Sequence, residues 1–184
     1  SDVGRFERVT NATNGVVGIP WDGALQDIFD AKCVSCHNGV PGPANKSLTI
    51  TDEEGATQTI VFDLGGQEVD YGVGEAMISG YTASHLSLLG PDPMDLEDAG
   101  LTVSGDMPVY VEAGNARGSL LIEKLNPPVR YPTPDLNTRA FPGPNHPEEL
   151  NEPGLTAEEY QLLIEMTDNG GQFYSRENAP GQSN

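Results

Sequence analysis

Five consecutive residues constrain this chain more than any other feature, because they contain both of its cysteines. Cys33 and Cys36 are separated by two residues, and His37 follows directly after the second thiol. C-x-x-C-H is the attachment signature of c-type haem, in which each thiol forms a thioether with one vinyl group and the imidazole ligates the iron. Changing the spacing or moving the histidine would lose one of these three bonds. The stretch therefore predicts a chain organised around one covalently held haem c.

A C-x-x-C pair also occurs in redox-active disulfides and in zinc sites. A redox pair is expected at the start of a helix that follows a strand, whereas this pair follows a helical pattern. Zinc would need two further ligands, which without a third cysteine would be His85 and His146, and neither belongs to an H-x₃₋₅-H pair. Haem attachment is the leading interpretation, with zinc and redox chemistry as the alternatives.

The charge of the chain is strongly one-sided. Nine basic and 28 acidic side chains give a formal net charge of −19. A surface of this sign repels nucleic acid and anionic lipid, and it speeds the encounter with a basic partner. Solubility is the alternative explanation. No apolar run approaches the length of about 18 residues that a transmembrane helix needs, so we expect no membrane span.

Several local patterns predict secondary structure in the 184 residues. A helix is expected from Trp21 into the motif, with Leu25, Ile28 and Phe29 on one apolar stripe. Thr156 and Glu159 form a capping box for a last helix that Gly170-Gly171 ends. The remaining segments are a short helix at 120–125 capped by Ser119, strand-like runs at 48–51, 58–64 and 107–111, an acidic solvated loop at 92–98, a proline-rich extended segment at 127–153, and a loose tail at 175–184.

This layout resembles the class I mono-haem c-type cytochrome family, most specifically over residues 21–37 and more generally over 117–174. The resemblance implies a mainly α, loop-rich fold around one haem, in a single domain of residues 1–184. It also implies that the first helix crosses the last, with Leu25, Ile28 and Phe29 against Tyr160, Leu163 and Ile164. Residues 47–112 fall outside the family layout, and we interpret them as a β-containing insertion with a small hairpin or sheet.

The family usually supplies a second axial ligand from the loop before the last helix. His146 is the first candidate because it lies ten positions before Thr156 and is followed by Pro147. Met107, also followed by proline, is the next, and His85 comes after it. An open iron site is the remaining alternative. A methionine opposite the histidine raises the reduction potential, while a second histidine generally leaves it lower.

The function that the resemblance implies is electron transfer by a non-enzymatic carrier. Cys33, Cys36 and His37 would hold the haem, and His146 would complete the coordination of the iron. The acidic surface would dock a basic redox partner. The family also implies a periplasmic or extracellular location, and no apolar signal segment begins the chain, so we expect a leader to have been removed. The alternatives are a haem enzyme or a gas or peroxide sensor with an open site, and a haem module of a larger secreted protein. The sequence gives no prediction for the oligomeric state.

Overall fold

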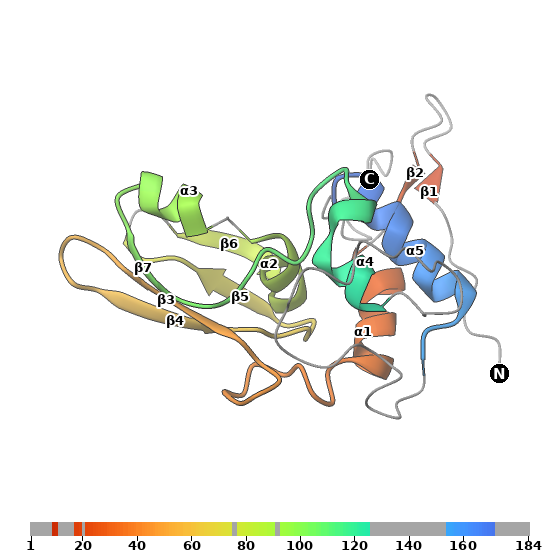
Figure 1. Ribbon diagram of the computed structural model, residues 1–184, viewed down its shortest axis with the longest axis horizontal. Helices are drawn as coiled ribbons and strands as arrows, with labels where there is room; N and C mark the ends of the chain where they lie inside the picture. The colour runs from red at the N-terminus through yellow and green to blue at the C-terminus, as the bar shows by residue number, and fades with distance from the viewer. Residues whose placement is uncertain are drawn as a thin grey trace, which may run out of the picture.

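Figure 1 shows the computed structural model, in which the helices near the motif gather at one end and the strands extend away from them. The helical end contains α1 (Gln26–Lys32), α4 (Leu120–Leu125) and α5 (Ala157–Asp168). The architecture is mixed α/β, so the prediction of a mainly α fold is wrong. The residues that the structure describes are 9–10, 17–19, 21–74, 77–90, 93–125 and 154–171.

The largest sheet has three antiparallel strands in the order β4-β3-β7. The central strand β3 (Ser47–Thr51) pairs with β4 (Thr57–Val61) on one side and with β7 (Thr102–Gly105) on the other. Buried and half-buried residues alternate along β3, which places Leu48 and Ile50 in the core. This is the two-residue period of a strand with one buried face. The predicted hairpin at 48–51 and 58–64 is confirmed by this pairing, with slightly different bounds.

The turn of this hairpin is built around Asp52 and Gly55. The Asp52 carboxylate accepts a 2.7 Å hydrogen bond from the backbone N–H of Ala56, and the Asp52 carbonyl accepts from Gly55. Gly55 has φ +85°, a left-handed conformation that residues with a Cβ adopt at a cost. The turn residues therefore fix the register of β3 against β4 from within a few positions of sequence.

A second antiparallel pair, β5 (Glu68–Tyr71) and β6 (Ile78–Thr82), leads directly into α2 (Ala83–Leu89). Thr82 caps α2, because its side chain accepts from the backbone N–H of His85. A further short pair, β1 (Val9–Thr10) and β2 (Val17–Gly18), lies at the helical end (Figure 1).

The acidic stretch at 92–98, which we predicted as a loop, contains the helix α3 (Pro93–Asp98). Proline is well tolerated at the first position of a helix, where no intrahelical hydrogen bond is lost. Leu96 is buried, while Asp95, Glu97 and Asp98 are exposed. Leu96 thus packs into the core while these three carboxylates lie on the solvent side of the helix.

The strand that we predicted at 107–111 is also wrong, because the strand of this region is β7, which ends at Gly105. Gly105 has φ +126°, and a Cβ at this position would lie 2.3 Å from the Ser47 carbonyl oxygen. Pairing with β3 ends just past this glycine, where the backbone N–H of Asp106 still donates to the Ser47 carbonyl at 3.1 Å. Met107 and Val111 beyond it are buried in the core.

The predicted helices near both ends of the domain are confirmed. A π-helical turn, η1 (Trp21–Leu25), precedes α1, and a 3₁₀ turn, η2 (Ala116–Gly118), precedes α4. The capping box of α5 is present in both directions, with Thr156 and Glu159 each bonding the other's backbone N–H. The Ser119 side chain does not cap α4 as we predicted. Its hydroxyl accepts from the backbone N–H of Glu112 and donates to the Asn115 carbonyl, so it braces the preceding loop.

Candidate functional site: the Cys33–His37 turn

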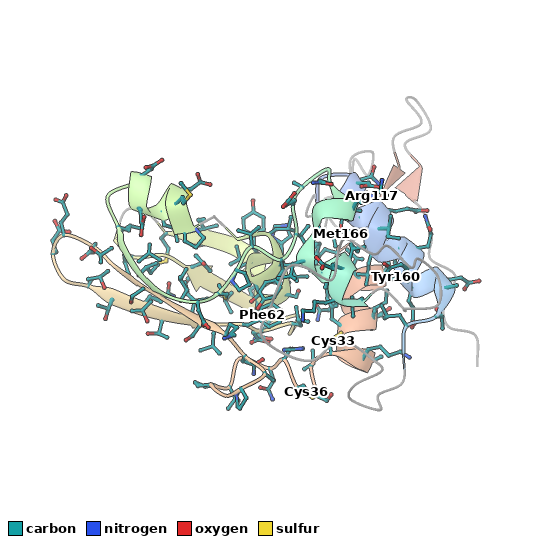
Figure 2. The ribbon with its side chains drawn as sticks, in the orientation of Figure 1. Cys33, Cys36, Phe62, Arg117, Tyr160 and Met166 are labelled. Carbon is teal, nitrogen blue, oxygen red and sulfur yellow. The ribbon has the colours of Figure 1, made fainter. Side chains whose placement is uncertain are left out.

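The motif forms a tight turn at the carboxyl end of α1. The Phe29 carbonyl accepts from the N–H groups of Cys33 and Val34 at 2.8 and 3.0 Å. The Cys33 carbonyl accepts in turn from Cys36 and His37, at 3.1 and 2.8 Å. Figure 2 shows Cys33 and Cys36 at the end of α1, where Cys33 is half-buried and Cys36 is exposed. The backbone hydrogen bonds of this turn thus fix Cys33, Cys36 and His37 at the end of the helix.

The helix that carries the turn is held by its apolar stripe. Leu25, Ile28 and Phe29 are all at most 3% exposed, as their spacing predicts. Phe29 also packs against the Trp21 ring, with centroids 6.0 Å apart. These buried side chains therefore hold α1 in the core, and the motif follows at the carboxyl end of the helix.

A buried polar network ties the first residue of α1 to the segment after β4 and to α2. The Gln26 amide nitrogen donates to the Leu64 carbonyl and to the Asp30 carboxylate, both at 2.8 Å. Its oxygen consequently faces Ser84, whose hydroxyl donates to it at 2.7 Å and accepts from the Trp21 indole at 2.9 Å. Because Trp21 and Ser84 are both fully buried, these hydrogen bonds replace the water that the groups lose on folding.

The His37 ring is contacted by two side chains from outside the motif. Its Nδ1 lies 3.1 Å from the Asn45 side-chain oxygen, and its edge meets the Phe62 ring at a centroid distance of 5.1 Å. The Tyr110 ring packs against Phe62 in a tilted arrangement, with ring centroids 4.4 Å apart. Burial, assisted by the nearby Asp106 carboxylate, raises the pKa of Tyr110 to about 12, so this phenol is neutral at physiological pH.

The segment after β4 runs beside the turn and supports it. The His37 carbonyl accepts from Leu64 at 2.9 Å, and Gly39 donates to the Phe62 carbonyl at 3.3 Å. The same segment continues to α2, where Gly65 accepts from the backbone N–H of Ser84. One short stretch therefore connects the motif, α1 and α2.

The candidates for a second iron ligand have different surroundings. His85 stacks on Tyr81 at 4.9 Å and meets the Trp21 ring edge-on at 4.7 Å, and its Nε2 lies 3.1 Å from the Gly171 carbonyl. A carbonyl only accepts, so Nε2 is the protonated nitrogen of His85. Burial lowers the pKa of His85, although the bond to Gly171 opposes the shift, and the ring is neutral at pH 7.

Met107 is buried and lines a cavity between the three-stranded sheet and α2, together with Leu48, Tyr71 and Leu86. His146, our first candidate, lies outside the described residues, as do the proline-rich segment at 127–153 and the tail at 175–184. The structure therefore brings Cys33, Cys36 and His37 together and places His85 and Met107 in core packing.

The donor set at the turn is the one that covalent haem attachment requires: two thiols that are not joined by a disulfide and an adjacent imidazole. A redox-active pair usually gains from a helix amino terminus, which stabilises a thiolate. This pair instead follows a helix carboxyl end, where the backbone carries partial negative charge. Within the part of the chain that the structure describes, no group of three or more His, Cys, Asp or Glu side chains is arranged to hold a metal ion.

Two residues that contact His37, Asn45 and Phe62, were not predicted from the sequence. Asn45 lies eight positions after His37, and Phe62 lay inside a run that we interpreted only as a strand. No periodicity relates either residue to the motif. The only available signal was indirect, since Asn45 shortly precedes the predicted hairpin and Phe62 lies in its second strand.

The chain matches no protein-family model, no curated protein and no solved structure. Among the described residues, no helix has the length and apolar character needed to cross a membrane.

Proposed function

We propose that this protein is a mono-haem c-type electron carrier. The observation that carries the proposal is the Cys33-x-x-Cys36-His37 turn at the carboxyl end of α1, with an exposed and a half-buried thiol beside an imidazole that is contacted from outside the motif. The resemblance to class I c-type cytochromes covers residues 21–37 most specifically and residues 117–174 more generally. It does not extend to the strand-rich region between them.

Each thiol would attach by adding its S–H across one vinyl double bond, sulfur to one carbon and hydrogen to the other. Nothing leaves and no oxidant is consumed, so the chain would gain the whole mass of the group. Bound haem would supply a Fe(II)/Fe(III) couple that exchanges one electron without a substrate. Cys33 and Cys36 would fix its orientation, His37 would ligate one face, and Phe62 would exclude water beside that histidine.

For the opposite face we propose His146, with Met107 and then His85 as the alternatives. In their present surroundings both alternatives would have to leave existing packing. Met107 would leave a core position that is 7% exposed, and His85 would give up the hydrogen bond from Nε2 to Gly171.

The partner that we propose is a redox protein with a basic docking surface, met in the periplasm or outside the cell. The net charge of −19 supports this choice, since opposite charges speed diffusional encounter and like charges suppress it. Screening is strong above about 0.1 M salt. The rate of electron exchange with a basic partner should therefore fall steeply with ionic strength.

The test is expression together with a c-type haem attachment system, followed by mass spectrometry and optical spectra of both redox states. The wild type should carry one covalent haem, and the double variant Cys33→Ser/Cys36→Ser should carry none. The Ser35→Ala variant is the matched control, because it changes the same turn and keeps all three donors. A wild-type chain that attaches no haem under these conditions would refute the proposal.

The spectra also separate a carrier from a haem enzyme or sensor. A six-coordinate carrier should bind little carbon monoxide in the ferrous state, and His146→Ala should open the iron to it. Ready carbon monoxide binding by the wild type would instead favour an open site. An unchanged spectrum in His146→Ala would remove His146 from the axial position.

A further inference from the structure

The orientation of the Asn45 side chain can be assigned from its neighbours. Asn45 is 7% exposed, and its amide nitrogen lies 2.8 Å from the Val40 carbonyl and 3.1 Å from the Cys36 carbonyl. Carbonyl oxygens only accept, so the NH₂ group must face them. The Asn45 oxygen therefore faces Nδ1 of His37, at 3.1 Å.

This orientation determines the tautomer of His37. An amide oxygen has no proton to give, so Nδ1 of His37 must donate in this hydrogen bond. In the neutral ring the lone pair then lies on Nε2, the nitrogen on the far side from Asn45. The bond also fixes the rotation of the ring, together with the edge contact to Phe62.

Both contacts come from the open end of one hairpin. Asn45 lies two residues before β3, Phe62 follows β4 directly, and the two ends are tied by the hydrogen bond from the Phe62 N–H to the Lys46 carbonyl at 2.8 Å. The strand pairing Ser47↔Val61 continues from this point. The hairpin thus holds the imidazole from two sides as a single rigid element.

We propose that the open end of the β3–β4 hairpin positions the proximal histidine, and that Asn45 is the positioning residue that selects the His37 tautomer with its lone pair on Nε2. This inference rests on the proposed function for the identity of the bound group. It gives the strand-rich region a role at the iron, through a hydrogen bond that strengthens the donor character of the imidazole. Partners of this kind typically change metal affinity or activity by 10- to 100-fold.

Two substitutions separate an effect on His37 from an effect on the loop. Asn45→Leu and Asn45→Asp both remove the NH₂ group that holds the Cys36 and Val40 carbonyls. Only Asn45→Asp keeps an acceptor for His37, and its carboxylate is a stronger one. Asn45→Asp also adds a negative charge that favours the ferric state through space, and Asn38→Asp measures that effect at a neighbouring position. With this effect subtracted, a purely structural role predicts the same result for both variants, whereas a role through His37 predicts opposite results.

The measurement is the reduction potential of the haem-loaded protein. Asn45→Asp should lower it and Asn45→Leu should raise it, because a more electron-rich imidazole favours the ferric state. A change of about tenfold in the relative stability of the two oxidation states corresponds to about 59 mV for one electron. Asn38→Ala is the control, since the exposed Asn38 contacts Asn45 only at 3.4 Å and does not share the His37 bond.

A shift in the same direction in both variants, or no shift beyond that of Asn38→Ala, would overturn the proposal. Long-range ¹⁵N–¹H spectra of the His37 ring provide a readout that does not depend on haem. If the wild type attaches no haem, the proposed function fails, but these spectra should still show a protonated Nδ1 that becomes mixed in Asn45→Leu. A wild-type ring protonated at Nε2 would refute the role of Asn45 in either case.

Discussion

The buried network that joins α1 to the rest of the molecule makes a prediction with a defined magnitude. In Ser84→Ala, the Trp21 indole loses a buried acceptor at 2.9 Å, and the Gln26 oxygen loses a donor at 2.7 Å. The Thr82 hydroxyl, 2.9 Å from Ser84, loses a third contact. Each intramolecular hydrogen bond contributes about 0.5–1.5 kcal/mol net, and a buried donor left without its acceptor costs about 1–3 kcal/mol. We therefore expect the free energy of unfolding to fall by about 2–4 kcal/mol.

Urea denaturation followed by circular dichroism measures this change on the full chain. The midpoint should fall while the slope with denaturant stays constant, which shows that stability and not the extent of unfolding has changed. Ser104→Ala on the exposed side of β7 is the matched control and should change stability by less than about 0.5 kcal/mol.

A double-mutant cycle with Gln26→Leu tests whether the network acts as a unit. Residues that share a hydrogen-bond network usually couple by about 0.5–3 kcal/mol. If Ser84→Ala costs no more than Ser104→Ala, or if its effect simply adds to that of Gln26→Leu, the network does not hold α1 in place as we have argued.

Three further predictions concern the hairpin, the last helix and His85. Gly55→Ala should destabilise the protein by about 1 kcal/mol, because φ is +85° at this turn, while Gly42→Ala, where φ is not positive, should be close to neutral in the same urea assay. Thr156→Ala should cost about 1 kcal/mol by removing half of the capping box, and equal stability would contradict the role of the cap. Burial lowers the pKa of His85 below its ordinary 6.5, so as pH falls the unfolded chain takes up this proton before the folded protein does. The stability that His85 contributes is therefore present above pH 6.5 and is lost as pH falls from 6.5 through the lowered folded pKa. The stability difference between wild type and His85→Gln should therefore change with pH below 6.5, and a constant difference would show that His85 does not titrate differently on folding.

Features encoded over a few residues were predictable from the sequence. The C-x-x-C-H spacing, the apolar stripe of α1, the Thr156–Glu159 capping box and the β3–β4 hairpin all depend on short-range geometry, in which residue spacing alone decides which groups meet. The fold class was mispredicted because several strands of the middle region are short and mostly exposed. Strands β5 and β7 have four residues each and β6 has five, too few for a clear alternation of buried and exposed side chains.

The surroundings of the motif were decided only by the tertiary structure. Strand β7 pairs with β3 across a long stretch of chain, and Ser84 meets Gln26 across 58 residues. Neither contact produces a periodic pattern, because its partners are far apart in the sequence. The same holds for His37. Its position after Cys36 can be read from the sequence, but in our proposal Asn45 determines which ring nitrogen carries the lone pair, and Asn45 lies next to the ring because of the hairpin. Local spacing therefore determines which donors are present, and tertiary packing determines how they are held.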